Sequence, residues 1–294
     1  MKYAFYDFSV SPYSYDFVSF LVAARGLGFE HVVFVPGKRM MRLPDGRVVE
    51  FQKCSPEEQA ARLENILKPL AQTFTVCETR EEARKLWSED CFPPGYTVDR
   101  PLPAHVPSAV LQIGRLSPVR PTSEALEAVK RDFSGELVTI TIRHSTIEPR
   151  RNSDPLAWIE LADELHRIGL RPVFIPDTEF QTDDFGQHDV SKRASIDVQY
   201  RLALYETAAL NMGVNNGPMA LCLLSRRPLL YFKPVTYGVY ATSPEFWANA
   251  NGIPVGTQPP WFSPYQKIVW ENDTPEVLSR ELHSWLARLE REAA

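Results

Sequence analysis

The run Leu137-Val138-Thr139-Ile140-Thr141-Ile142 constrains the fold more than any other segment of the chain. It is continuous and rich in β-branched residues, a pattern typical of a strand that is buried on both faces. Such strands belong to parallel sheets, whose crossover connections place helices on the two faces of the sheet. The run therefore predicts an α/β fold for the C-terminal half of the chain.

The rest of this half alternates between helices and strands, as a parallel sheet requires. A helix is predicted to begin at Ser153-Asp154-Pro155, where a capping side chain precedes a proline, and to stop at Gly169. The elements expected after it are the strand Pro172–Pro176, the helix Val198–Leu210, the strand Met212–Val214, the helix Pro218–Leu224 and the strand Leu229–Phe232. This order of elements predicts a doubly wound sheet.

The N-terminal half begins with the same alternation. A strand at Lys2–Asp7, a helix up to Arg25 and a strand at His31–Val35 predict a parallel βαβ unit. The elements expected after it are the helix Glu57–Leu70, the strand Phe74–Cys77, the helix Arg80–Trp87 and a last strand at Ala109–Ile113. Prolines crowd between Phe92 and Pro107, which predicts an irregular connector there.

The length of the chain fits two domains of ordinary size, since it has 294 residues. We place the boundary near Pro118–Pro121 and expect an N-terminal α/β lobe over residues 1–118 and a C-terminal α/β lobe over residues 119–273. The remaining segment, residues 274–294, is expected to form a helix with one apolar face. The predicted fold class is α/β, with two Rossmann-like doubly wound lobes.

Composition narrows the classes of function. The formal net charge is −5, which gives no sign of the basic face that nucleic-acid binding needs. The four cysteines form no C-x-x-C pair, so we interpret them as reduced thiols in a reducing compartment. No secretory signal and no membrane-spanning apolar run is found. We therefore expect a soluble, cytoplasmic protein, and peripheral contact with a membrane stays open.

The junction Asn211–Ala220 is the strongest candidate for a ligand site. A strand ends there, Asn215-Asn216-Gly217 turns the chain, and Pro218-Met219 starts a helix. A helix start has unpaired N–H groups and a dipole that favours an anion, and Gly217 permits close approach of the ligand. Open α/β sheets bind ligands at this end of their strands. A tight turn without a ligand is the alternative.

Basic residues follow two of the predicted strands. Arg143 comes directly after the buried run, Arg150 and Arg151 follow in the same loop, and Lys233 comes just after the strand Leu229–Phe232. Guanidinium groups gathered at one edge of a sheet suit bidentate binding of phosphate. The alternative is a solvated loop with surface arginines. His144, next to Arg143, is by itself more often structural than catalytic.

Two stretches, Arg151–Phe174 and Val214–Phe232, resemble the C-terminal lobe of GT-B glycosyltransferases, above all the ADP-heptose lipopolysaccharide heptosyltransferase group. The likeness is carried by three motifs: Arg150-Arg151-Asn152, Trp158-Ile159-Glu160-Leu161-Ala162-Asp163-Glu164-Leu165 and Asn215-Asn216-Gly217-Pro218-Met219-Ala220. Arg143 is also similar to the arginine motif of fucosyltransferases, which contacts the donor pyrophosphate. The chain departs from the heptosyltransferase pattern at Asn215-Asn216, where that group has Asp-Ser or Asp-Thr, and at Ala220-Leu221, where its helix carries a histidine.

The resemblance implies metal-independent transfer of a sugar from a nucleoside-diphosphate donor to the hydroxyl of a glycan or small-molecule acceptor, without a cofactor. Arg143, Arg150 and Arg151 would bind the diphosphate, opposite the turn Asn215–Met219. Lys233 would offset the charge of the leaving group. The resemblance to GT-B glycosyltransferases also implies a cleft between the lobes and a C-terminal helix that packs back toward the N-terminal lobe. The plainer expectation is that this helix covers the second sheet.

The catalytic base that the resemblance implies is Asp16, at the first strand-to-helix junction. Capping of the first helix is the plainer interpretation of Asp16, and Asp7 is the reserve candidate.

A rival motif, Asp177-Thr178-Glu179, resembles the D-x-D of metal-dependent GT-A glycosyltransferases and would hold Mg²⁺ or Mn²⁺. Two further functions stay open: a nucleotide-sugar epimerase on the same fold and a catalytically silent nucleotide- or glycan-binding protein.

Overall fold

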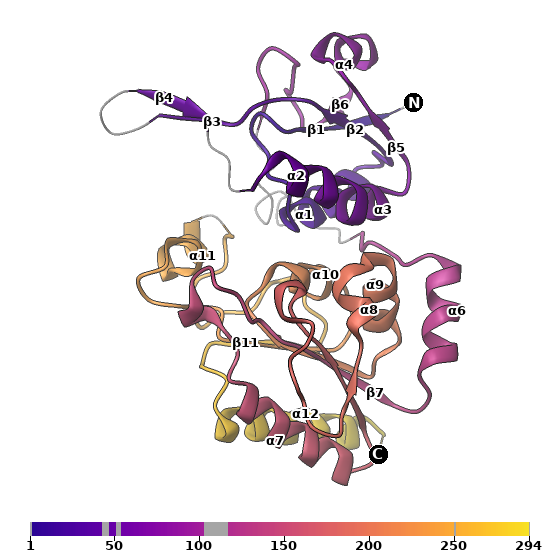
Figure 1. Cartoon of the computed structure of the whole chain (residues 1–294), viewed down its shortest axis with the longest axis vertical. Helices are drawn as coiled ribbons and strands as arrows, with labels where there is room; N and C mark the ends of the chain where they lie inside the picture. Colours follow the sequence, from indigo (N-terminus) through magenta and orange to yellow (C-terminus); the bar gives the residue numbers. More distant parts are fainter. Residues whose placement is uncertain (1, 43–46, 51–53, 103–116, 250, 294) are drawn as a thin grey trace. The chain divides into compact units, whose positions relative to one another are not determined.

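A computed structural model describes residues 2–42, 47–50, 54–102, 117–249 and 251–293. The chain divides into two compact units, Met1–Val119 and Arg120–Ala294. Each unit is an α/β structure with its own parallel sheet (Figure 1). The strand expected at Ala109–Ile113 lies outside the described residues.

The first unit is built on four parallel strands in the order β5-β2-β1-β6. These strands are β1 (Tyr3–Asp7), β2 (His31–Val35), β5 (Phe74–Val76) and β6 (Cys91–Phe92). The helical segments are α1 (Asp16–Gly26), α2 (Pro56–Arg62), η1 (Leu63–Leu67), α3 (Lys68–Ala71) and α4 (Arg80–Leu86). Pairing of β1 with β2, from Tyr3 opposite His31 to Asp7 opposite Val35, confirms the predicted βαβ unit. An antiparallel pair, β3 (Met40–Arg42) with β4 (Val48–Glu50), was not predicted.

The end of β1 is fixed by the buried carboxylate of Asp7. Arg80, at the start of α4, donates to both of its oxygens, at 3.0 and 2.8 Å, and the Tyr96 hydroxyl donates at 2.9 Å. The hydroxyl and the backbone N–H of Ser9 donate to the same carboxylate. Arg80 also donates to the carbonyls of Pro36 and Val98. This network joins the ends of β1 and β2 to the connector that follows β6.

The second unit is built on six parallel strands in the order β12-β11-β10-β7-β8-β9. Its strands are β7 (Leu137–Thr141), β8 (Arg171–Ile175), β9 (Asp189–Val190), β10 (Leu210–Val214), β11 (Leu229–Phe232) and β12 (Gln266–Val269). The connections from β7 run outward to β8 and β9, whereas those from β10 run outward to β11 and β12. The order therefore reverses between β7 and β10, which makes this pair the topological switch point of the sheet. The predicted doubly wound sheet is confirmed.

Helices cover both faces of the second sheet, with α7 and α12 on one face and α6, α8 and α9 on the other (Figure 1). The long helices are α6 (Ser123–Asp132), α7 (Pro155–Arg167), α9 (Val198–Thr207) and α12 (Pro275–Ala293). The shorter helical segments are η2 (Pro149–Arg151), η3 (Thr178–Phe180), α8 (Lys192–Ile196), η4 (Gly217–Met219), α10 (Ala220–Leu223), η5 (Tyr240–Thr242) and α11 (Pro244–Asn249). The sequence explains the start of α7, because the Asp154 side chain caps this helix and a proline occupies its first position.

The C-terminal helix α12 belongs to the core of the second unit. Its residues Leu278, Leu282 and Trp285 share one apolar cluster with Leu161 and Leu165 of α7. These contacts are the ones expected of a helix that covers the second sheet. That α12 also packs toward the N-terminal lobe remains a prediction, as does the cleft between the lobes.

We predict that Arg80→Met destabilises the first unit by about 3 kcal/mol, because it leaves the Asp7 carboxylate buried without its cation. Urea denaturation and hydrogen exchange of the β1 amides would measure the loss. Arg84 is a matched control on the same helix: it is exposed and pairs with Glu81 and Asp99, so Arg84→Met should cost less than about 1 kcal/mol. Equal effects of the two variants would contradict a structural role for the Asp7–Arg80 pair.

Candidate functional site

The candidate site lies at the carboxyl edge of the second sheet, where β7 and β10 end side by side. Thr141 pairs with Gly213 in these strands. The loop at residues 143–154 follows β7 and the turn at residues 215–219 follows β10; we call them the switch-point loops. The structure thus places the arginine loop and the Asn215–Met219 turn, which lie far apart in the sequence, at neighbouring strand ends.

Arg143 lies at this edge, but its guanidinium folds into its own loop. It donates to the carbonyl of Ile147 at 2.6 Å, to the carbonyl of Glu148 at 3.4 Å and to Asn152 Oδ1. Its side chain is only 7% exposed. Burial lowers the pKa of Arg143, and the neighbouring charge of Arg151 lowers it further. Arg143 therefore organises the loop that carries Arg150 and Arg151, and direct contact with a phosphate remains a prediction for it.

Arg151 connects the two switch-point loops, because its Nη2 donates to the carbonyl of Asn215 at 3.2 Å. Its Nε is buried and has no acceptor among the described residues. Burial also lowers the pKa of Arg151. Within the described ranges, neither Arg143 nor Arg151 forms an ion pair with a carboxylate. Glu148 acts on both cations through space, and Asp177 and Glu179 act on Arg143, but none of these carboxylates contacts either guanidinium group.

The turn after β10 is closely packed. Asn215 Nδ2 donates to the carbonyl of Pro234 at 2.9 Å, and Asn216 Oδ1 accepts from the N–H of Met219 at 3.2 Å. Met219 is fully buried, whereas Gly217 is exposed and Pro218 is half-buried. The Met219 amide is thus occupied by Asn216, and the exposed backbone of the turn lies at Gly217.

Lys233 fixes the end of β11 to the first of the switch-point loops. Its Nζ donates to the carbonyl of Asn152 at 2.7 Å and lies 3.6 Å from Asp273 Oδ1. Asp273 is buried and also accepts from the backbone of Asp154 and the indole of Trp158, each at 2.9 Å. Lys233 has a positive φ of 49°, which is rare for a residue with a side chain.

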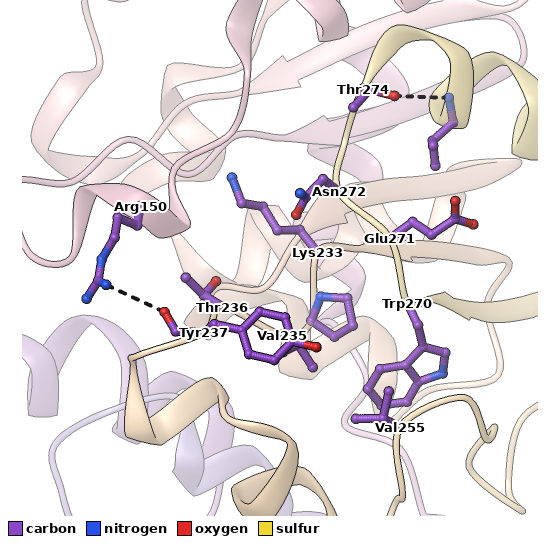
Figure 2. A pocket seen from close by; sticks show the side chains of 12 residues that line it. Arg150, Lys233, Val235, Thr236, Tyr237, Val255, Trp270, Glu271, Asn272 and Thr274 are labelled. Carbon is purple, nitrogen blue, oxygen red and sulfur yellow. Dashed lines mark hydrogen bonds between the residues drawn. The ribbon is translucent and has the colours of Figure 1, made fainter.

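A pocket of about 590 Å³ opens beside these loops, at the ends of β11 and β12 (Figure 2). Two of the predicted residues, Arg150 and Lys233, contribute to its wall. In Figure 2 Arg150 and Trp270 lie at opposite ends of the pocket, with Lys233 and Asn272 between them. Arg150 donates to the carbonyls of Tyr237 and Gly238, at 3.5 and 3.4 Å. The volume is that of a typical small-molecule site.

Several pocket residues were missed from the sequence. They lie in the segments after β11 and β12, namely Thr236, Tyr237, Trp270, Asn272 and Thr274. The short run Gln266-Lys267-Ile268-Val269 was the available signal, because as a strand it places Trp270 at the carboxyl edge. The Trp270 N–H is occupied by the carbonyl of Thr257 at 2.9 Å. Its ring therefore contributes a face and not a donor.

The two candidates for the catalytic base, Asp16 and Asp7, lie in the first unit. Asp16 is the first residue of α1 and is exposed. It lies near the hydroxyl of Tyr6: burial raises the pKa of Tyr6, and the Asp16 carboxylate raises it further. Asp7, the reserve base, is buried and fully hydrogen-bonded, so the structure assigns it the structural role described above. The structural role of Asp7 could not be predicted from the sequence, because the partners of its carboxylate, Arg80 and Tyr96, are distant along the chain.

The acidic residues after β8 hold the loop that follows β7. Asp177 accepts from the N–H of His144 at 3.4 Å and Glu179 from the N–H of Thr146 at 3.5 Å. Burial raises the pKa of Asp177. His144 stacks on Phe180 and its Nδ1 lies 2.8 Å from Asp183 Oδ2. No group of three or more His, Cys, Asp or Glu side chains in the described ranges is arranged to hold a metal ion.

Comparisons with known proteins give the fold. No protein-family model and no curated protein matches the chain. A glycosyl transferase family 9 structure from Veillonella parvula is similar at 11% identity and a TM-score of 0.53, covering 98% of this chain and 97% of that one. The ADP-heptose lipopolysaccharide heptosyltransferase II of E. coli aligns at 12% identity and a TM-score of 0.45, with 98% and 77% covered.

The similarity to the family 9 structure and the two parallel sheets confirm the predicted fold class, an α/β protein with two Rossmann-like lobes. In the part of the chain that the structure describes, no helix has the length and apolar character needed to cross a membrane.

We predict that Arg151→Met leaves the melting temperature of the free protein unchanged or raises it, because it removes a half-buried, unpaired cation and keeps the apolar stem. The same change should weaken the binding of inorganic pyrophosphate by about tenfold or more. Calorimetry of both properties would test this. Arg167→Met, on the exposed surface of α7, should change neither property. A large loss of stability in Arg151→Met would show that Arg151 has a structural role and would contradict its assignment to ligand binding.

Proposed function

We propose that this chain is a glycosyltransferase that moves a sugar from a nucleoside-diphosphate donor to an acceptor hydroxyl. The observation that carries the proposal is a pair of neighbouring guanidinium groups at the switch point of the second sheet, the buried Arg143 and the partly buried Arg151, neither of which contacts a carboxylate among the described residues. Burying a charge without a partner in contact costs free energy, so these two guanidinium groups favour the binding of an anion. A diphosphate offers two negative groups and the acceptor geometry that guanidinium binds best.

The position of this charge supports a nucleotide over other anions. Ligands of open α/β sheets bind at the carboxyl edge beside the switch point, which is where the arginines lie. Arg150 and Lys233, at the wall of the neighbouring pocket, extend the basic surface toward Trp270. We place the diphosphate against Arg151, Arg150 and Lys233, with Gly217 allowing close approach. The nucleoside then lies in the pocket against Trp270, with hydroxyl and amide partners in Thr236 and Asn272.

The reaction follows from these roles. Asp16 accepts the proton of the acceptor hydroxyl, and the acceptor oxygen forms a bond to the anomeric carbon of the donor sugar. The bond from that carbon to the diphosphate oxygen breaks, and its electron pair stays on the diphosphate. Fixed positive charge from Arg143, Arg150, Arg151 and Lys233 stabilises this leaving group, which is the role a metal plays in other transferases. The transfer is therefore proposed to be metal-independent.

A test of the nucleoside position uses two probes that differ by the nucleoside alone. Trp270→Ala should weaken binding of UDP or ADP by about five- to a hundredfold, because stacking on an aromatic ring is worth about 1–3 kcal/mol. Binding of inorganic pyrophosphate should be unchanged, since it needs only the basic residues. Calorimetric titration measures both. If Trp270→Ala weakens both probes equally, or neither, the nucleoside does not lie in this pocket.

The reaction itself is tested by the release of nucleoside diphosphate from a panel of nucleotide sugars, with and without glycan acceptors. Asp16→Asn should reduce transfer by about 10²- to 10⁴-fold while donor affinity stays the same. EDTA should leave donor binding and transfer unchanged. A large loss that Mn²⁺ restores would move the diphosphate site to Asp177 and Glu179.

Two outcomes of this assay would replace the proposal. The phosphate-site residues Arg143, Arg151 and Lys233 all belong to the second unit, so donor binding does not by itself require Asp16. Binding without turnover of any donor would therefore identify a nucleotide-binding protein. Conversion of the donor to its epimer without an acceptor would identify a nucleotide-sugar epimerase.

A further inference from the structure

His144 and Asp183 form a hydrogen-bonded pair at the carboxyl edge of the second sheet that the proposed reaction does not use. Nδ1 of His144 lies 2.8 Å from Asp183 Oδ2, and the imidazole stacks on Phe180 with 3.6 Å between the ring centroids. The carboxylate fixes the direction of one ring nitrogen, and Phe180 covers one face of the ring. The fold therefore also sets the direction of the second nitrogen, Nε2.

The Nε2 atom of His144 is accessible to a ligand. An ionised carboxylate only accepts hydrogen bonds, so Asp183 places the proton of the neutral imidazole on Nδ1 and leaves a lone pair on Nε2. Nε2 has no partner among the described residues and is open to solvent, and the side chain as a whole is 40% exposed. A hydroxyl group that reaches this nitrogen can donate a hydrogen bond to it.

His144 and Arg151 lie on opposite sides of the end of β7. The N–H of His144 donates to Asp177, which follows β8, at 3.4 Å. Arg151 donates to the carbonyl of Asn215, which follows β10. Because β7 lies between β10 and β8 in the sheet, the imidazole is on the side of β7 that faces away from the proposed diphosphate contacts.

The parts of the proposed donor follow the order of the strands. The nucleoside is placed against Trp270, after β12, and the diphosphate against Lys233 and Arg151, at the ends of β11, β10 and β7. The sugar is attached to the phosphate that is farther from the nucleoside. A donor that extends along this edge therefore carries its sugar past Arg151 toward the end of β8, one strand spacing of about 4.8 Å further on. His144 lies at this position.

Carboxylates outnumber cations around the imidazole. Asp183 contacts the ring of His144, Asp177 contacts its backbone, and Glu179 contacts the backbone of the same loop. The guanidinium of Arg143 is close by, but it donates within its own loop and contacts none of the three. An acidic sugar would be repelled here, whereas the hydroxyls of an uncharged sugar would find acceptors.

We propose that His144 is a specificity-determining residue for the donor, whose Nε2 accepts a hydrogen bond from a hydroxyl of an uncharged sugar. The carboxylates around it disfavour acidic sugars. Asp183 is a positioning residue, since it acts through the imidazole. This inference rests on the proposed function and names the class of sugar that the donor carries.

The first test varies the charge of the sugar and keeps the nucleotide the same. Calorimetric titration should show that UDP-glucuronate binds at least about twofold more weakly than UDP-glucose. The double variant Asp177→Asn/Glu179→Gln keeps the acceptor oxygens that hold the loop and removes two negative charges. It should reduce the difference between the two probes.

The second test separates recognition of the sugar from support of the loop. His144→Asn keeps a donor toward Asp183 and removes the acceptor at Nε2, so it should weaken binding of UDP-glucose or ADP-glucose by about two- to tenfold. Binding of UDP or ADP should be unchanged. His144→Gln places an amide near the position of Nε2 and should restore part of the loss. His283→Gln is the matched control: this exposed histidine lies 3.4 Å from Glu164, and its loss should affect no probe.

A spectroscopic readout follows the imidazole itself. In protein with ¹⁵N-labelled histidine, His144 is identified among the six histidines from the spectrum of His144→Asn. The free protein should carry the His144 proton on Nδ1. UDP-glucose or ADP-glucose should shift the Nε2 resonance, and the parent nucleotide should not.

Three results would overturn this inference and leave the diphosphate site intact. The first is a His144→Asn variant that weakens the nucleotide and its sugar conjugate equally, or neither. The second is equal affinity for UDP-glucuronate and UDP-glucose, and the third is binding of a sugar conjugate that leaves the Nε2 resonance unmoved. Absence of binding by all of these nucleotides would overturn the proposed function, and this inference with it.

Discussion

The pairing of β7 with β10 is the contact on which the candidate site depends. Gly213 lies opposite Thr141, and a Cβ atom at Gly213 would come within 2.9 Å of the Thr141 carbonyl oxygen and 3.0 Å of Met219 Sδ. A side chain at this position would separate the two strands or displace the buried Met219. Glycine therefore keeps the strand ends close enough for Arg151 to reach the carbonyl of Asn215 and join both switch-point loops.

The second unit maintains several arrangements at this edge that are unfavourable in isolation. Lys233 adopts a left-handed backbone conformation, Glu148 does the same in the neighbouring loop, and Arg151 has a buried nitrogen without an acceptor. Each costs about 1–3 kcal/mol, and each persists because surrounding contacts over-determine it. At Lys233, one such contact is the buried carboxylate of Asp273, which also accepts from the backbone of Asp154 and the indole of Trp158. Concentration of strain at one edge is typical of a binding site.

Much of the fold could be predicted from the sequence because its strands are continuous and apolar and its helices carry clear caps. The strand at Leu137–Thr141 and the helix that Asp154 caps are examples. The strands β9 and β12 were missed, since β9 has only two residues and β12 begins with the polar pair Gln266-Lys267. With β12 missed, Trp270 and Asn272 could not be placed at the pocket. The inward fold of Arg143 was also beyond the sequence, because it depends on carbonyls that face inward only once the loop closes.

The helix α12 takes part in the walls of two pockets of the second unit, one beside Lys233 and one of about 650 Å³ at the amino edge of the sheet. Thr274 and Val277, at its start, line the pocket beside Lys233, and Trp285 to Glu290 line the pocket at the other edge. At a rise of about 1.5 Å per residue, Val277 and Trp285 are about 12 Å apart on one rigid rod. Insertion or loss of a single residue between them would rotate one group relative to the other by about 100°. The spacing along α12 is therefore under a double constraint that neither pocket alone would impose.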